Sequence, residues 1–140
     1  MTAPMHAMTD ERWLGFFRAC ADTLEVKPAP LSAPVEDGSW CSWTTFSRLT
    51  DAVGYWSGPL PTAAELRDTY LGHGQNWSQY FTYTQVCHVI VPRVFVWERA
   101  VPGQFEQGKT LQDIDAVAET LRALDIPHRL TSLVLEVKCY

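Results

Sequence analysis

The fold is decided by residues 86–98, which read VCHVIVPRVFVWE. β-branched and aromatic residues fill this stretch and predict extended strands, and apolar residues at both alternating sets of positions predict a strand covered on both faces. Proline cannot donate to a sheet ladder, so Pro92 marks an edge, a bulge or a bend. Pro92 and Arg93 also make a poor tight turn, because neither residue favours a positive φ.

Three helices are predicted around this stretch. Apolar residues recur at helical spacing over 10–24 and again over 111–124, where Thr110 would be the N-cap. A T-x-x-E capping box, in which each side chain satisfies a free backbone donor, predicts a third helix over 63–71.

Shorter β-like runs add further strands. Residues 41–47 and 52–57 mix β-branched with aromatic residues and predict two short strands, with a turn near 49–51. The chain ends on alternating apolar residues over 133–140, which predict a last strand.

The composition fits one folded domain. The chain has 140 residues, of which 46% are hydrophobic and 19% charged, so it can bury a sizeable core. Together with the element pattern, this predicts a single α+β domain over 9–140, after a flexible leader over 1–8. We expect a mostly antiparallel sheet of about four to six strands and three helices.

Charge and hydropathy exclude two classes of partner. The formal net charge is −5 and there is no basic run, which argues against nucleic-acid binding, since phosphate contacts need clustered Lys and Arg. Neither a signal-peptide pattern nor a stretch long and apolar enough to span a membrane is present. We therefore expect a cytoplasmic protein with no membrane partner, whose four cysteines are reduced thiols.

The usual signatures of catalysis and of metal or cofactor binding are missing. Cys87 and His88 are adjacent, so on a strand they point to opposite faces and cannot easily act as nucleophile and base. The four histidines are scattered, without the spacing of metal ligands. Paired carboxylates fall only at expected helix starts and loops. We expect no catalytic residue, no metal and no cofactor.

One stretch resembles a nucleotide-binding loop. Residues 103–110 read GQFEQGKT, which matches the G-x-x-x-x-G-K-T pattern of a P-loop. Against this interpretation, Glu106 would repel phosphate, and no later strand ends in an Asp that could hold magnesium. The simpler interpretation is a surface loop whose Thr110 caps the following helix.

Aromatic and acidic residues gather between the first helix and residue 80. Tyr and Trp anchors ringed by acids are typical of a surface that binds a basic protein, although large aromatics also fill cores. The predicted partner-binding residues are Glu36, Asp37, Trp40, Trp43, Asp51, Tyr55 and Trp56.

The chain resembles the small bacterial immunity proteins of polymorphic and contact-dependent toxin systems in size, acidity and aromatic-rich α+β build. Residues 60–74, LPTAAELRDTYLGHG, look like the helix segment of the SUKH immunity superfamily, and 111–140 look like the helix-then-strand ending of several small bacterial families. The remainder departs from the SUKH pattern, so its fold is not carried over.

This resemblance implies a protein that neutralises a cognate toxin, such as a basic nuclease, by stoichiometric occlusion of its active site. Charge complementarity would speed the association. Two rival functions stay open at this point: a nucleotide-binding enzyme or sensor that uses Gly103–Thr110, and a non-catalytic adaptor or structural subunit. The sequence leaves the oligomeric state open.

Overall fold

The computed structural model describes residues 8–24, 26, 39–51, 54–72, 76–77 and 80–140. Within these residues the chain forms an α+β domain around an antiparallel five-stranded sheet, which confirms the predicted fold class. The strands of this main sheet, in spatial order, are β2 (Trp56–Gly58), β1 (Cys41–Thr45), β5 (Val86–Pro92), β9 (Val134–Lys138) and β8 (Arg129–Leu130).

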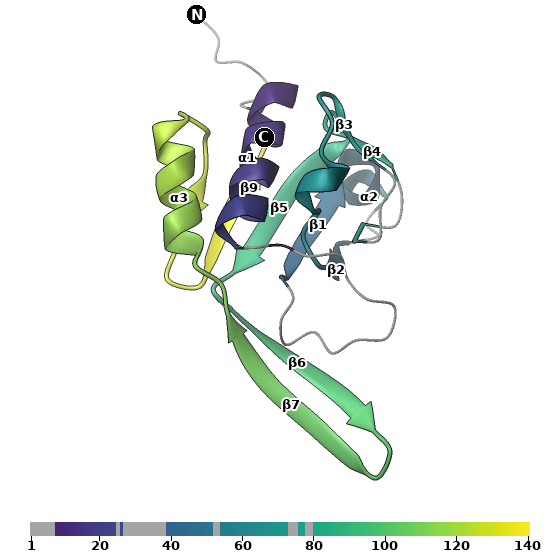
Figure 1. Cartoon of the computed structure of the whole chain (residues 1–140). Coiled ribbons are helices and arrows are strands. Elements are labelled where there is room, and N and C mark those ends of the chain that lie inside the picture. The colour runs from purple at the N-terminus through teal and green to yellow at the C-terminus, as the bar shows by residue number, and fades with distance from the viewer. Residues whose placement is uncertain (1–7, 25, 27–38, 52–53, 73–75, 78–79) are drawn as a thin grey trace, which may run out of the picture.

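Two helices lie side by side over one face of this sheet (Figure 1). They are α1 (Asp10–Thr23) and α3 (Ile114–Ala123). The cross-strand register identifies the face of the sheet that the helices cover. Trp43, Val89 and Val137 are paired across three neighbouring strands, so their side chains lie in one row, and all three are buried. Neighbouring rows point to the opposite, outer face, since side chains alternate along a strand.

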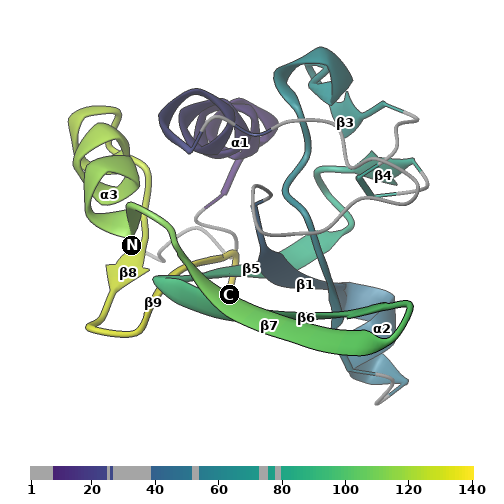
Figure 2. The same ribbon diagram turned by 60° about the horizontal axis from the view of Figure 1, so that its bottom comes forward.

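Smaller elements lie at the sides of the main sheet (Figure 2). A short helix and a 3-10 turn flank it, and two separate two-stranded sheets complete the described part of the chain. These elements are α2 (Phe46–Thr50), η2 (Ala63–Glu65), the pair β3 (Tyr70–Leu71) and β4 (Phe81–Thr82), and the hairpin β6 (Val94–Val101) and β7 (Gln104–Leu111).

Stacked aromatic rings form the centre of the core. Trp43 of β1 lies flat on Trp77, with ring centroids 4.1 Å apart and planes 6° apart. Phe17 of α1 meets Trp77 edge-on at 5.4 Å, so the helix, the sheet and the loop that carries Trp77 share one cluster. Offset or edge-to-face ring pairs add about 0.5–1.5 kcal/mol beyond the area they bury.

The helix predicted over 10–24 is confirmed. Thr9 is extended at the N-cap and its hydroxyl accepts a hydrogen bond from the backbone amide of Arg12, while Asp10 and Glu11 stand in the first turn, where acids favour the helix dipole. The predicted stripe is buried, with Trp13 and Phe17 facing the core.

The helix predicted over 63–71 is wrong. Only η2 forms there, because the chain becomes extended at Leu66 and then pairs through β3 with β4. The two residues of the supposed capping box bond to one another instead: the Thr62 hydroxyl donates to a Glu65 carboxylate oxygen at 3.2 Å. Burial of Leu66 and Leu71 in the core outweighs the local capping preference.

The start of the last helix is also corrected. Residues 104–111 form a strand, so Thr110 is paired with Phe95 of β6 and does not cap a helix. The predicted turn at Pro102-Gly103 does form, with Gly103 at φ 84°, a left-handed conformation that glycine adopts without strain. This turn folds β7 back on β6, and Asp113 becomes the N-cap of α3 by accepting from the Ala116 amide.

Two of the remaining strand predictions are confirmed with changed limits. The strand predicted over 41–47 ends at Thr45, where α2 replaces the turn predicted near 49–51. The strand predicted over 52–57 is observed as β2; residues 52–53 lie outside the described residues.

Pro92 marks a bend, as predicted. β5 ends at Pro92 and β6 begins at Val94, so the chain leaves the main sheet between them. Gln112, the residue after β7, fixes this corner: its side chain accepts from the Trp40 amide at 2.9 Å and donates to the carbonyls of Trp40 and Pro92. The buried Gln112 amide therefore joins the hairpin to the start of β1.

We predict that Gln112→Ala lowers the free energy of unfolding by about 2 kcal/mol, because it leaves backbone groups at this corner without partners. Urea denaturation measures the loss. Gln107→Ala, at an exposed position of the preceding strand β7, is the matched control and should change stability by less than about 0.5 kcal/mol. Equal losses in the two variants would contradict the anchoring role.

Candidate functional site

The predicted partner-binding residues separate into core and surface positions. Glu36 and Asp37 lie outside the described residues. Trp43 is only 4% exposed, so its ring belongs to the core and is not accessible to a partner. Trp40 is half-buried and stacks on Phe95 at the root of the hairpin.

The other three predicted residues lie near strand β2, at one edge of the main sheet. Asp51 and Tyr55 are exposed, and Trp56 is half-buried. Trp56 stacks on Trp43, and the Arg48 guanidinium lies 3.8 Å from the Trp56 ring centroid. This edge is therefore built directly on the aromatic core.

The same side of the molecule continues through β4 and β3. Trp56 meets Phe81 edge-on at 5.3 Å, and the preceding residue, Tyr80, pairs with Tyr70 at 6.2 Å. Both views show α2, β4 and β3 along one side of the molecule (Figures 1 and 2). We name this surface the aromatic edge; it consists of Leu49, Asp51, Trp56, Asp68, Tyr70 and Tyr80, whereas Tyr55 points to the opposite face of the sheet.

Sequence reasoning missed Tyr70 as a surface residue. It was assigned to the helix over 63–71, whereas in β3 it is 38% exposed and pairs with Tyr80. The available signal was a tyrosine that follows Asp68 and Thr69 and precedes Leu71 and Gly72, which is as consistent with a short strand as with a helix end.

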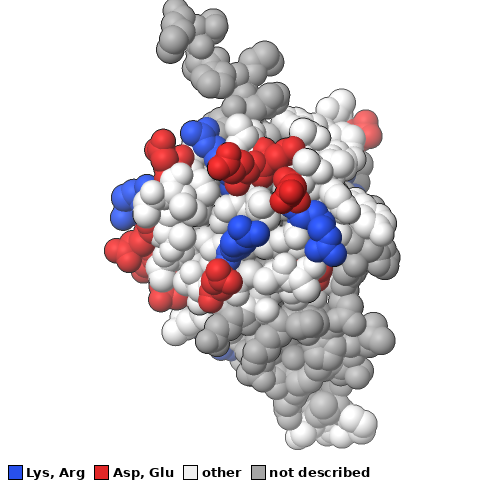
Figure 3. All heavy atoms as spheres, turned by 45° about the horizontal axis from the view of Figure 1, so that its top comes forward, with Lys and Arg blue, Asp and Glu red and all other residues white. Residues whose placement is uncertain are grey.

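Charges of both signs are mixed on the surface. On the face that carries α1, acidic side chains lie in the middle and basic side chains stand beside them (Figure 3). On the aromatic edge, Asp51 and Asp68 are accompanied by Arg48 and Arg67. The Arg67 guanidinium donates to the backbone carbonyls of Ala64 and Leu66, so it is held against the chain.

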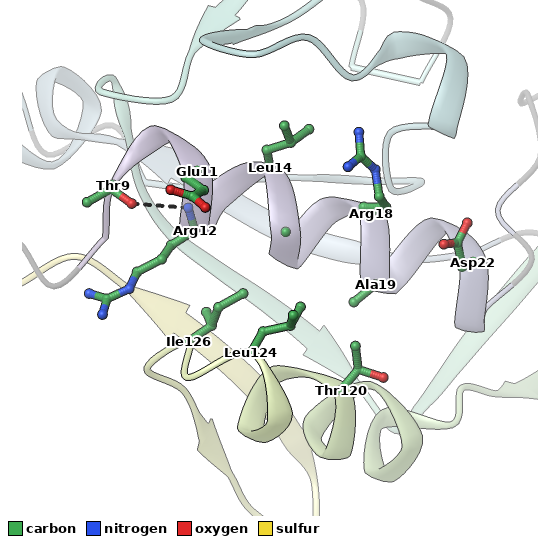
Figure 4. Close-up of a pocket in the computed structure, with 11 residues that line it drawn as sticks. Thr9, Glu11, Arg12, Leu14, Arg18, Ala19, Asp22, Thr120, Leu124 and Ile126 are labelled. Atoms are coloured by element: carbon green, nitrogen blue, oxygen red, sulfur yellow. Dashed lines mark hydrogen bonds between the residues drawn. The ribbon is translucent and has the colours of Figure 1, made fainter.

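A groove runs between α1 and α3 (Figure 4). It encloses about 710 Å³ and is lined by apolar side chains of α1 and of the segment that follows α3, including Leu14 and Ile126, with Arg18 and Asp22 along α1. Gly15 lets α1 approach this segment, because a Cβ there would lie 3.0 Å from Ile126 Cδ1. The groove is open to solvent and polar groups do not converge in it as they do in most enzyme pockets.

The four cysteine thiols are buried and none is in a disulfide: Cys20, Cys41, Cys87 and Cys139. Burial raises the pKa of each thiol, most strongly for Cys20 and Cys41, and raises that of Cys139 to about 11. A thiol with a raised pKa carries little thiolate at neutral pH, and thiolate is the reactive form.

A hydroxyl, an imidazole and a carboxylate meet on the outer face of the main sheet. The Tyr55 hydroxyl lies 2.8 Å from His88 Nδ1, and His88 Nε2 lies 3.9 Å from Glu136 Oε2. With the ring proton on Nε2, Tyr55 donates to Nδ1 and the N–H faces Glu136. Burial lowers the pKa of His88, with Glu136 opposing the shift, and burial raises the pKa of Tyr55.

A hydroxyl, an imidazole and a carboxylate in this order could relay a proton. The protonation states of Tyr55 and His88 favour a structural role instead. Tyr55 keeps its proton at neutral pH and His88 is neutral, so neither group is a ready nucleophile. The hydrogen bond instead fixes the ring of Tyr55, which is exposed on the outer face of the main sheet.

The P-loop match does not fold as a P-loop. A phosphate-binding loop needs successive amides turned inward before a helix N-terminus. Gly108 and Lys109 lie in β7, paired with Trp97 and Val96, and α3 begins only at Ile114. The extended backbone of 104–111 therefore supplies no phosphate cradle.

Within the described ranges, no three His, Cys, Asp or Glu side chains come together as metal ligands. Likewise, no helix in the part of the chain that the structure describes is long and apolar enough to cross a membrane.

Comparison with known proteins adds no relative. The chain matches no protein-family model, no curated protein and no solved structure. The functional proposal below therefore depends on the geometry of the chain itself.

We predict that His88 makes the fold less stable in acid. The pKa of His88 is lowered from 6.5 in the folded chain, so the unfolded chain takes up the proton first, and the free energy of unfolding falls as the pH drops below that value. Denaturation at a series of pH values between about 7 and 5 measures this slope, which His88→Gln should flatten. His128→Gln is the control, and an unchanged slope in His88→Gln contradicts the assignment.

Proposed function

We propose that this protein is a non-catalytic binding protein of the immunity type, which neutralises a cognate protein toxin by stoichiometric occlusion. The aromatic edge is the contact surface in this proposal. The observation that carries it is the exposure of Tyr70 and Tyr80, which pair with one another beside Trp56 and Phe81, above a rigid aromatic core.

Tyrosines at these positions suit binding for a physical reason. Tyr presents a large apolar ring and a polar hydroxyl while losing little rotamer freedom, and it is enriched among residues that dominate binding energy. Trp56 is held by Trp43 and Phe81, and Tyr70 and Tyr80 pair with one another. A surface ordered in advance loses less conformational entropy when a partner docks.

The overall charge favours a basic partner. With 16 acidic and 11 basic residues, the chain would attract a positively charged toxin domain such as a nuclease, and this attraction would raise the association rate at low salt. Because charges of both signs line the aromatic edge, we assign the affinity to the tyrosines and the rate of encounter to the net charge.

The partner to test is the product of the adjacent gene, co-expressed and co-purified with this chain. Tyr80→Ala should weaken the complex about 30-fold, because it removes an exposed anchor from the aromatic edge without touching the core. Isothermal titration calorimetry measures the affinity. Tyr140→Ala is the matched control, since Tyr140 is 62% exposed against 63% for Tyr80 but lies outside the aromatic edge.

The Tyr140→Ala complex should keep its affinity within about threefold. Co-expression should also protect cells from the neighbouring product if that product is toxic. The proposal fails if the adjacent product does not bind, or if Tyr80→Ala binds as tightly as the unaltered chain.

A further inference from the structure

The hairpin β6–β7, which we name the arm, projects beyond the body of the domain (Figures 1 and 2). Its root is fixed by Gln112 and by Phe95, whose ring stacks on Trp40 at 5.8 Å. Each strand has eight residues, which span about 26 Å. The arm is therefore a firmly attached, elongated surface.

Apolar side chains of the arm face solvent. Val96 and Phe105 are each 62% exposed and Leu111 is 77% exposed. In the described part of the chain, β6 and β7 pair only with one another. A lone two-stranded hairpin is marginally stable in water, and gathered exposed apolar residues mark a contact surface. Both points indicate that the arm is covered when the protein works.

Strand alternation defines the face that is uncovered. Alternate residues of each strand lie on one face, and the described side chains on it are exposed. Apolar residues stand at its root and near its tip, with an acid and a base between them. This outer face of the arm carries Val94, Val96, Glu98, Phe105, Gln107, Lys109 and Leu111.

We propose that a second copy of this chain covers the outer face of the arm. The two arms pack face to face and run in opposite directions, related by a two-fold axis. The axis passes between the cross-strand pair Val96–Lys109 and the pair Glu98–Gln107. A two-fold contact uses the same surface on both subunits, so the face must complement itself when reversed.

The order of residues along the arm meets this requirement. Reversal places the tip of one arm over the root of the other, so that Phe105 packs on Leu111 of the second copy. The same operation brings Lys109 toward Glu98 of the second copy. Both contacts occur twice, which gives two apolar ends around a centre of opposite charges.

Charge complementarity favours a second copy over an unrelated protein. Neither Glu98 nor Lys109 forms an ion pair within the residues that the structure describes. A strongly basic or acidic partner would meet one favourable and one unfavourable charge, whereas a reversed copy meets two favourable ones. Two such faces bury on the order of 1,000 Å², the low end for specific interfaces, so we expect a micromolar dimer.

Charge reversal tests the arrangement by sedimentation equilibrium over a concentration series. Glu98→Lys places two lysines opposite each other at both central contacts, and Lys109→Glu places two glutamates there. Each variant alone should dissociate at least about tenfold more readily than the unaltered chain. Both positions are exposed, so circular dichroism and urea denaturation should show unchanged folding.

Mixing the two variants gives the decisive result. In the mixed dimer, Lys109 of one chain meets Glu98 of the other, and the two reversed residues also meet as opposite charges. The equimolar mixture should therefore dimerise at least about tenfold more tightly than either variant alone. A chain that stays monomeric up to about 1 mM, or variants that dimerise unmixed as the unaltered chain does, would overturn the proposal.

The dimer and the proposed toxin binding can fail separately. Phe105→Ser removes an apolar contact from each end of the paired arms and should abolish the dimer. It leaves the aromatic edge intact, so the affinity for the adjacent gene product should stay unchanged. A dimer that survives Phe105→Ser contradicts the face-to-face arrangement, whatever the adjacent product does.

Discussion

The flat stack of Trp43 on Trp77 is the contact on which the remainder of the structure depends. With 4.1 Å between ring centroids, it joins strand β1 to the segment that carries Trp77, and Phe17 of α1 meets Trp77 edge-on. The Trp77 indole N–H donates to the Pro59 carbonyl, which orients the ring. Trp56 then stacks on the outside of Trp43, so the rigidity of the core reaches the surface.

Local patterns predicted the fold where packing agrees with them. The helix over 10–24 has a cap, an acidic first turn and a buried stripe, and it folds as expected. The segment 63–71 has a capping box as well, yet it buries Leu66 and Leu71 by extending and pairing with β4. A capping box contributes about 1 kcal/mol, less than the burial of two leucines, so tertiary contacts decide there.

The candidate surface was only partly predictable for the same reason. Composition placed an aromatic surface between residues 36 and 56, but it cannot tell a core tryptophan such as Trp43 from a half-exposed one such as Trp56. Tyr70 joins the surface through a strand pairing that local patterns did not predict. The arm was not predicted, because residues 103–110 match a P-loop pattern. The turn at Gly103 and the register of β6 with β7, which form the arm, are seen only in the structure.

We propose that the molecule has two contact surfaces: the aromatic edge binds a toxin, and the arm binds a second copy of the chain. Hydrogen exchange of the amides, measured for the chain alone and with the adjacent gene product bound, tests the central claim most directly. When the partner binds, we expect amide hydrogen exchange to slow in residues 47–57 and 69–82 and to stay unchanged in residues 10–23 and 114–126. Slowing confined to α1, α3 and the groove between them would contradict it.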